Sequence, residues 1–328
     1  MSEFIPRDAK GWLFVALAAF TIYYLVALVR VVFASRRERR GMAVDGGTER
    51  SAALSDAAVT PGRFATGFVT NFFDTLGIGS FATTTSIYRF FRMVPDEWIP
   101  GTLNVGHTIN AIAQAYIYTR IVPVEATTLI SMILAAVLGA WLGAGVVAGW
   151  QRQRIQWGMG LCLLGAATLM LLSQTGFLPA GGELLGVTGV KLGIAVVANF
   201  ALGALMTLGI GLYAPCLILV SLLGMNPTSG FPIMMGSCAF LMPIASARFI
   251  EKRAFHLGAA LGLMLGGLPA VFIAAFLVKS LNLATVRWLV IVVVVYTATT
   301  MLLAARRGRA TSLEAGGAAA PRRGGRPG

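Results

Sequence analysis

Charged residues are scarce in this chain, making up 12% of its 328 residues, while hydrophobic residues make up 57%. A water-soluble fold of this length could not bury that much apolar surface, so the composition predicts an integral membrane protein. Apolar runs of about 20 residues are long enough to cross a bilayer as helices. Because the runs are continuous and do not alternate with polar residues, they favour helices over a membrane β-barrel.

Cysteine is also scarce, and a nucleotide-binding P-loop is absent from the sequence. Cys162, Cys216 and Cys238 lie in apolar runs without CxxC spacing, so they predict neither a disulfide framework nor a metal site. We expect Cys216 and Cys238 to be small packing residues, with the handling of a sulfur-containing substrate as the alternative. We expect no cofactor, and the absence of a P-loop leaves an ion, proton or substrate gradient as the energy source.

The balance of charge is positive, with a net charge of +13. Such a charge could indicate nucleic-acid binding, but the arginines cluster in loops and tails, where the positive-inside rule explains them better. The expected partner is therefore a lipid bilayer and no nucleic acid, and the sequence leaves homo-oligomerisation open.

Apolar runs and polar segments divide the chain into five parts. We expect an N-terminal transmembrane helix in 1–34, because its apolar run from 11 to 34 is too long for a signal-peptide core. A cytoplasmic linker follows at 35–61, and a disordered cytoplasmic tail occupies 306–328, since neither has enough apolar residues to pack. Two membrane units fill the space between them, at 62–185 and 186–305.

The two units are predicted from a repeat. The pentapeptide TLGIG occurs at 75–79 and again at 207–211. In the same ungapped register, four residues recur: Ala82, Met93, Pro95 and Pro100 match Ala214, Met225, Pro227 and Pro232. An Asn-Phe pair precedes each copy, at 71–72 and 199–200, and three apolar runs follow each copy, at 98–119, 123–149 and 155–174, and at 230–249, 254–278 and 283–305. The pattern predicts a duplicated membrane unit.

The positions of the arginines indicate how the glycine-containing segments lie. If 62–92 crossed the membrane once, then Arg89, Arg92, Arg152 and Arg154 would be exported, whereas a re-entrant hairpin keeps them inside. About a dozen residues on each side of the glycines suffice to reach mid-bilayer. We therefore expect an all-α integral membrane protein with one leading transmembrane helix and two inverted repeats, each a broken re-entrant helical hairpin plus three spanning helices. The N-terminus lies outside and the C-terminus is cytoplasmic.

The glycine motifs also predict a binding site. Glycine permits unusual dihedral angles, so a new half-helix begins after each break, with free N–H groups and a positive dipole end directed at mid-bilayer. Helix packing through small residues is the alternative, and the in-phase duplication favours the site. The residues expected to bind substrate are Thr75, Gly77, Gly79, Ser80, Thr83, Asn104, His107, Thr207, Gly209, Gly211, Tyr213, Cys216 and Ser237.

Asp74 and His107 are ionisable residues within the expected membrane region and are candidates for proton or charge coupling. Asp74 either relays a proton or caps the half-helix at Ser80, and its counterpart in the second unit is Met206. His107 shares helical spacing with a polar stripe that contains Asn104, Asn110 and Gln114. It either binds an anion when protonated or is a hydrogen-bonded packing residue.

The stretches TLGIGSFATTT…PGTLNVGH and TLGIGLYAPC…FPIMMGS, each followed by a glycine-rich run, resemble the sulfite exporter TauE/SafE (TSUP) family of membrane permeases over residues 62–305. The resemblance implies a secondary transporter in the bacterial cytoplasmic (inner) membrane for small sulfur-containing anions such as sulfite, sulfonates or thiosulfate. Ser80-Phe81 and Leu212-Tyr213 stand where the family carries further glycines, which leaves the substrate open. The alternatives are an anion channel and, more remotely, an intramembrane enzyme that uses Asp74 and His107. We expect no enzyme and assign no catalytic residue.

Overall fold

A computed structural model describes residues 9–42, 56–177, 182–209 and 211–277, together with 288, 291–292, 294–296, 298–299 and 301–306. About half of the expected linker, nearly all of the expected tail and much of the last apolar run therefore lie outside the described residues. The residues described within that last run are helical.

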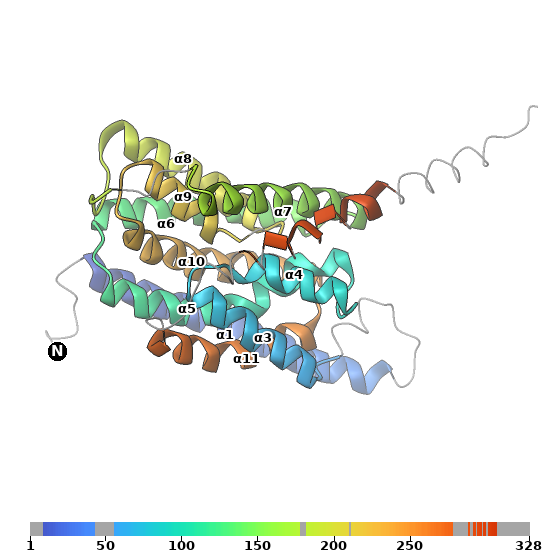
Figure 1. The fold of residues 1–328 in the computed structure, drawn as a ribbon. Helices are drawn as coiled ribbons and strands as arrows, with labels where there is room; N and C mark the ends of the chain where they lie inside the picture. Colours follow the sequence, from blue (N-terminus) through green and yellow to red (C-terminus); the bar gives the residue numbers. More distant parts are fainter. Residues whose placement is uncertain are drawn as a thin grey trace, which may run out of the picture.

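The described residues fold almost entirely into helices (Figure 1). The α-helices are α1 (Ala9–Met42), α3 (Pro61–Thr75), α4 (Ser80–Phe90), α5 (Ile99–Ile121), α6 (Ala126–Val147), α7 (Arg152–Gln174), α8 (Gly189–Met206), α9 (Tyr213–Leu222), α10 (Gly230–Glu251) and α11 (Leu257–Leu277). Two 3-10 turns, η2 (Asp96–Trp98) and η3 (Pro227–Ser229), lead into α5 and α10. The prediction of an all-α protein is confirmed.

Six of these helices are long and apolar enough to cross a membrane, namely α1, α6, α7, α8, α10 and α11. This confirms the prediction of a multi-pass membrane protein. Helix α5 has 23 residues and so has the length to cross. It carries several buried polar side chains and is enclosed by its neighbours along most of its length. A polar helix of this kind belongs at the centre of a membrane bundle, away from lipid.

Helix α1 begins near the predicted position but extends further. It continues to Met42, eight residues past the expected end of the span at Ala34. Its arginines and glutamate are good helix formers, so the polar sequence lengthens the helix into the expected linker. In the apolar part, the buried hydroxyl of Tyr24 donates a hydrogen bond to the carbonyl of Val105 at 2.5 Å, which fixes α1 against α5.

The helices of the two predicted units are interlocked. Helix α11 packs along α3, α8 packs along α6, and α5 and α10 pack together at the centre. In Figure 1, α6, α7, α8 and α9 gather on one side of the bundle, with α1, α3, α5 and α11 on the other. A β-carbon added at Gly67 would lie 2.7 Å from Leu263 Cα, and one at Gly203 would lie 2.7 Å from Ala136 Cα. Small residues therefore permit both close helix contacts.

Both TLGIG motifs interrupt a helix, as predicted. Helix α3 ends at Thr75 and α4 begins at Ser80, while α8 ends at Met206 and α9 begins at Tyr213. Gly77, Gly79 and Gly209 have φ angles of 86°, 89° and 89°, a region that favours glycine. Ile210 of the second motif lies outside the described residues.

Candidate functional site

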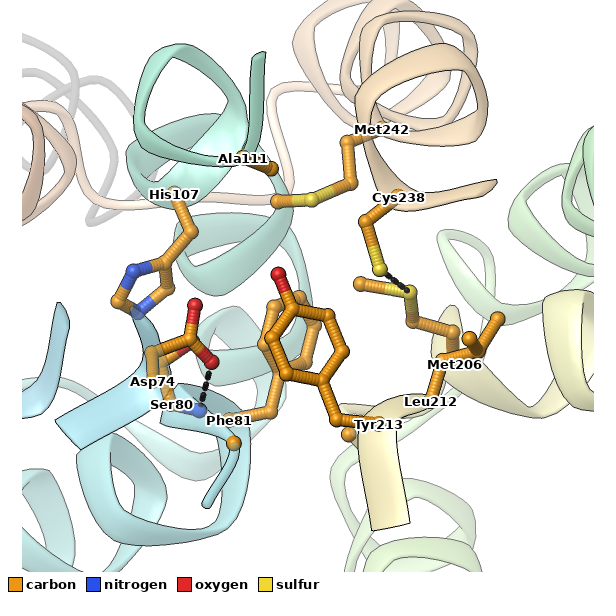
Figure 2. A pocket seen from close by; sticks show the side chains of 12 residues that line it. Asp74, Ser80, Phe81, His107, Ala111, Met206, Leu212, Tyr213, Cys238 and Met242 are labelled. Carbon is orange, nitrogen blue, oxygen red and sulfur yellow. Dashed lines mark hydrogen bonds between the residues drawn. The ribbon is translucent and has the colours of Figure 1, made fainter. Parts of the chain in front are cut away.

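A small cavity lies where the two interrupted segments meet (Figure 2). It is lined by Asp74, Gly79, Ser80, Phe81, His107, Ala111, Met206, Gly211, Leu212, Tyr213, Cys238 and Met242. Its volume of about 10 Å³ is at the lower limit for one water molecule. The described residues that line it include one carboxylate and no lysine or arginine. The cavity is thus small and is lined by residues of both predicted units.

The two motifs contact each other reciprocally at this cavity. A β-carbon added at Gly79 would lie 3.9 Å from Tyr213 Cβ, and one added at Gly211 would lie 3.9 Å from Phe81 Cβ. Each glycine is the last residue of its TLGIG motif, and each aromatic residue follows two positions later. The absence of a side chain at both glycines therefore leaves the space between the starts of α4 and α9 open.

Asp74 lies at the end of α3 and is buried. Its Oδ1 accepts a hydrogen bond from the backbone N–H of Ser80 at 2.5 Å. Ser80 is the first residue of α4, so the carboxylate occupies the N-terminal end of this helix, where backbone N–H groups and the helix dipole favour negative charge. Of the two roles expected for Asp74, the capping geometry is present.

Gln114 connects Asp74 to the second unit. Its Nε2 donates to Asp74 Oδ2 at 2.9 Å and to Thr75 Oγ1 at 3.0 Å. Its Oε1 accepts a short hydrogen bond from the hydroxyl of Tyr213, the first residue of α9. All four side chains are buried. A continuous polar bridge therefore runs from the end of α3 through α5 to the start of α9.

His107 lines the cavity, but protein groups occupy both of its ring nitrogens. Nδ1 lies 3.0 Å from Asn71 Oδ1, and Nε2 lies 3.1 Å from Thr84 Oγ1. Asn71 uses its Nδ2 to donate to the carbonyl of Gly67, so its Oδ1 is an acceptor towards His107. His107 Nδ1 is therefore the donor, and in the neutral ring Nε2 accepts from the Thr84 hydroxyl. This is the hydrogen-bonded packing arrangement.

The second unit has a related but simpler contact. Asn199 of α8 donates from Nδ2 to Ser237 Oγ of α10 at 3.0 Å and to the carbonyl of Met132 at 2.7 Å. Asn71 and Asn199 belong to the two Asn-Phe pairs, and His107 and Ser237 each follow a glycine in the next long helix. Close by, Cys238 Sγ lies 3.6 Å from Met206 Sδ, so sulfur atoms form one wall of the cavity (Figure 2).

The cavity brings together only part of the predicted site. The expected residues that line it are Asp74, Gly79, Ser80, His107, Gly211 and Tyr213. Thr75 touches the polar bridge through Gln114. The expected residues that do not line it are Gly77, Thr83, Asn104, Thr207, Gly209, Cys216 and Ser237.

Several of these excluded residues have identifiable roles in the helices. The hydroxyls of Thr83 and Thr207 donate to carbonyls of their own chain segments at 2.9 Å and 2.7 Å, a common use of threonine in membrane helices. Asn104 Nδ2 donates in the same way to the carbonyl of Pro100. Cys216 is fully buried and free, as expected of a packing residue.

A second cavity of about 80 Å³ adjoins the first glycine motif. It is lined by Gly77, Ile78, Met170, Ser173, Gln174, Leu217 and Ile218. It lies between α7, α9 and the break after α3, so Gly77 faces a different space from Gly79.

Other residues of the site were not predicted as site residues. Gln114 belongs to the predicted polar stripe of α5, and its seven-residue spacing from His107 places both on the same helix face. Phe81 and Tyr213 coincide in the repeat register, which is a signal for the reciprocal contact. Ala111 and Met242 are apolar residues in apolar helices, and no sequence pattern distinguishes them from lipid-facing or core positions.

Metal binding has no support in the described part of the chain, where no three His, Cys, Asp or Glu side chains come together as a metal site would require. Comparisons with protein-family models, curated proteins and solved structures found no match to this chain.

Proposed function

We propose that the chain is a secondary membrane transporter for small sulfur-containing anions such as sulfite, sulfonates or thiosulfate, in the bacterial cytoplasmic membrane. The observation that carries the proposal is the reciprocal contact of Gly79 with Tyr213 and of Gly211 with Phe81 at a buried cavity. Two helix N-termini that meet inside a membrane protein form a setting for an anion, as in transporters with interrupted helices. The choice of sulfur-containing anions comes from the TauE/SafE resemblance of the motifs.

Each interrupted segment is proposed to be a re-entrant hairpin. Helices α4 and α9 have 11 and 10 residues, hence lengths of about 16 Å and 15 Å, half of a hydrocarbon core of about 30 Å. The ends of each segment also lie close together. A β-carbon at Gly62 would lie 3.5 Å from Met93 Cε, and Lys191 Nζ donates to the carbonyl of Leu223 at 3.1 Å. These contacts support a return of each segment to the side from which it entered.

The two units are proposed to be inverted repeats related by a pseudo-two-fold axis. Such an axis would exchange α3 with α8, α5 with α10, and α6 with α11, so each contact would have a counterpart. Two such pairs of contacts occur. The contact of α3 with α11 corresponds to that of α8 with α6, and the contact of α5 with α11 corresponds to that of α10 with α6. The Asn71–His107 and Asn199–Ser237 hydrogen bonds form another such pair. Movement of one repeat against the other would then expose the central cavity to either side in turn.

The cavity in its present form is too small for a sulfite ion, so it fits an occluded state without substrate. An anion would enter by separating Phe81 from Tyr213 and would lie between the N-termini of α4 and α9. The larger cavity beside Gly77 is a candidate for part of the entry route.

A counterflow experiment tests transport. Purified protein is reconstituted into liposomes loaded with excess unlabelled sulfite, and labelled sulfite is added outside. We expect transient accumulation of label, because a carrier exchanges substrate, whereas a channel gives equilibration without accumulation. Gly211→Leu, which fills the cavity, should abolish accumulation. Gly165→Leu is a matched control, since Gly165 has no atom within 4 Å of an added β-carbon. Failure of the wild-type protein to exchange any of the named anions would overturn the proposal.

Orientation is tested separately. In a variant without the native cysteines, probes at Gly176 and Gln153 should be labelled from outside and from inside respectively. These residues lie at opposite ends of α7. Reversed labelling would contradict an outside N-terminus and a cytoplasmic C-terminus.

A further inference from the structure

We propose that the carboxylate of Asp74 competes with the substrate anion for the N-terminus of α4. We further propose that protonation of Asp74 changes the hydrogen bond between Gln114 and Tyr213. Anion binding would then require uptake of a proton by Asp74, so the transporter is an anion–proton symporter. The inference rests on the proposed transport function and adds to it the coupling ion and the residues that couple.

The position of Asp74 is the first observation. Its carboxylate accepts the N–H of Ser80 at 2.5 Å and lines the cavity together with Gly79 and Gly211. A substrate anion at the start of α4 would bind to the same N–H group and the same positive end of the helix dipole. The protein's own carboxylate therefore already holds the place that a substrate oxygen would take.

The second observation is the charge around this carboxylate. The titratable groups that face Asp74 are His107, Tyr118 and Tyr213 and the thiol of Cys238, and among the described residues no lysine or arginine lines the cavity. With no cation beside it, an ionised Asp74 about 4 Å from a bound anion would weaken binding by a factor on the order of 10³ at a moderate dielectric. Protonation of Asp74 removes this repulsion and frees the N–H of Ser80.

The third observation is the orientation of the Gln114 amide. Its Nε2 must face Asp74 and Thr75, and its Oε1 must face the hydroxyl of Tyr213, because an ionised carboxylate only accepts hydrogen bonds. A proton on Asp74 Oδ2 turns that oxygen into a donor. Two donors would then face each other, so the amide turns to present Oε1 to the acid and Nε2 to the Tyr213 oxygen. The Thr75 hydroxyl, which now donates to the Asn71 carbonyl, turns its hydrogen towards Oε1.

The amide rotation links the two half-sites. After it, Tyr213 accepts from Gln114, and its hydroxyl hydrogen becomes free to point at an anion in the cavity. The proton enters from the same aqueous side as the anion, rests on Asp74 Oδ2, and leaves on the other side when the anion is released. No bond other than the O–H bond forms or breaks. Binding of the proton thus prepares both helix starts for the anion.

Tyr118 supplies a matched control. Its hydroxyl donates to the carbonyl of Thr75 at 2.7 Å, so it bonds to the same break in the chain as Asp74, and its hydrogen bond does not involve the Gln114 amide. Removal of this hydroxyl should disturb local packing to a similar degree as removal of the Tyr213 hydroxyl, but it leaves the bridge intact.

The test is infrared difference spectroscopy of the reconstituted protein as the pH is lowered, without substrate. We expect a protonated carboxyl band that is absent from Asp74→Asn, shifted in Gln114→Leu and Tyr213→Phe, and unchanged in Tyr118→Phe. A band that persists in Asp74→Asn, or that is identical in Gln114→Leu and the wild type, would overturn the switch.

Proton movement is then measured during net thiosulfate uptake into liposomes that contain no anion substrate, because thiosulfate does not change its own protonation near neutral pH. The wild type and Tyr118→Phe should move protons with the anion, and Asp74→Asn should lose proton movement. Net anion uptake without proton movement in the wild type would overturn the switch. Because the infrared spectra need no substrate, a wild type that shows the expected bands but exchanges no anion would overturn the transport proposal and leave the switch supported.

Discussion

The two interrupted segments share the TLGIG motif but differ in the side chains around it. The first segment surrounds its break with Asn71, Asp74, Thr75 and Ser80, all buried and hydrogen-bonded. At the second break the residue in the place of Asp74 is Met206, and Leu212 stands in the place of Ser80. The helix interruption recurs in both copies, whereas the buried carboxylate and imidazole belong to the first copy.

This difference indicates that the backbone geometry of the site and its buried charge have separate roles. Geometry that must be symmetric, such as two helix starts meeting at one cavity, depends on glycine and on backbone N–H groups, so both copies retain it. In the proposed transport cycle a charge must be neutralised only once, and a second buried carboxylate would add a further desolvation cost. The predictions below compare corresponding features of the two copies.

The largest difference is expected between His107→Leu and Ser237→Ala. Loss of the imidazole leaves the Asn71 carbonyl and the Thr84 hydroxyl without their partner in a buried site, at about 1–3 kcal/mol for each unpaired group. Ser237→Ala should cost about 1 kcal/mol or less, because Asn199 keeps its bond to Met132. Thermal unfolding in detergent should show a much lower midpoint for His107→Leu, and equal midpoints would contradict the asymmetry.

A smaller difference is expected between Gly79→Ala and Gly211→Ala. Gly79 has φ 89° and ψ 130°, close to a region that only glycine readily occupies, so alanine should cost roughly 1–3 kcal/mol. At Gly211, an added β-carbon would make only an ordinary contact, at 3.9 Å from Phe81 Cβ. Its alanine variant should unfold within about 0.5 kcal/mol of the wild type. A larger loss at Gly211 would show that the two breaks do not differ as described.

The smallest difference is expected in the pH dependence of stability, and it concerns α6 of the first unit and α11 of the second. Glu125 accepts the N–H groups of Thr127 and Thr128 at the start of α6. Burial alone would raise its pKa, but these hydrogen bonds outweigh burial and lower the pKa from 4.5 to about 2. At the start of α11, burial and the nearby Arg63 lower the pKa of His256 from 6.5 to about 4.

Both shifts make the folded state less stable in acid, but in different pH ranges. The unfolded chain binds a proton on His256 at higher pH than the folded chain does, so stability falls as the pH drops from 6.5 towards 4. The contribution of Glu125 is complete above 4.5 and is lost towards 2. Unfolding midpoints against pH should flatten in the upper range for His256→Gln and in the lower range for Glu125→Gln. The same response in both variants would refute the assignment.

The sequence predicts the helices well because their signals are local. Apolar runs, the TLGIG breaks and prolines before α5 and α10 set most boundaries near where the structure has them. The extension of α1 to Met42 was missed because polar residues were taken to end the helix, although arginine and glutamate are good helix formers. The inverted arrangement and the orientation rest on charge placement and remain predictions.

The site was harder to predict, since its composition depends on contacts between distant helices. The glycines and Tyr213 were predicted from the repeated TLGIG motif, and the proposed pseudo-two-fold axis would bring such equivalent residues together. Ala111 and Met242 have no such signal. Ser237 and Asn104 were expected to bind substrate because they are polar, but Ser237 bonds to Asn199 and the amide group of Asn104 bonds to Pro100 of its own helix. Polarity in a membrane helix indicates a need for partners, which the protein itself can supply.

The contact between the two helix breaks can be tested by disulfide cross-linking in a variant without Cys162, Cys216 and Cys238. The β-carbon separations of 3.9 Å for Gly79→Cys with Tyr213→Cys, and for Phe81→Cys with Gly211→Cys, fall within the range of disulfides. We predict that both pairs cross-link under mild oxidation and that each cross-link stops anion exchange, which reduction restores. Gly165→Cys paired with Tyr213→Cys should not cross-link. If neither reciprocal pair cross-links, or if exchange continues at full rate in the cross-linked protein, the two breaks do not form the transport site.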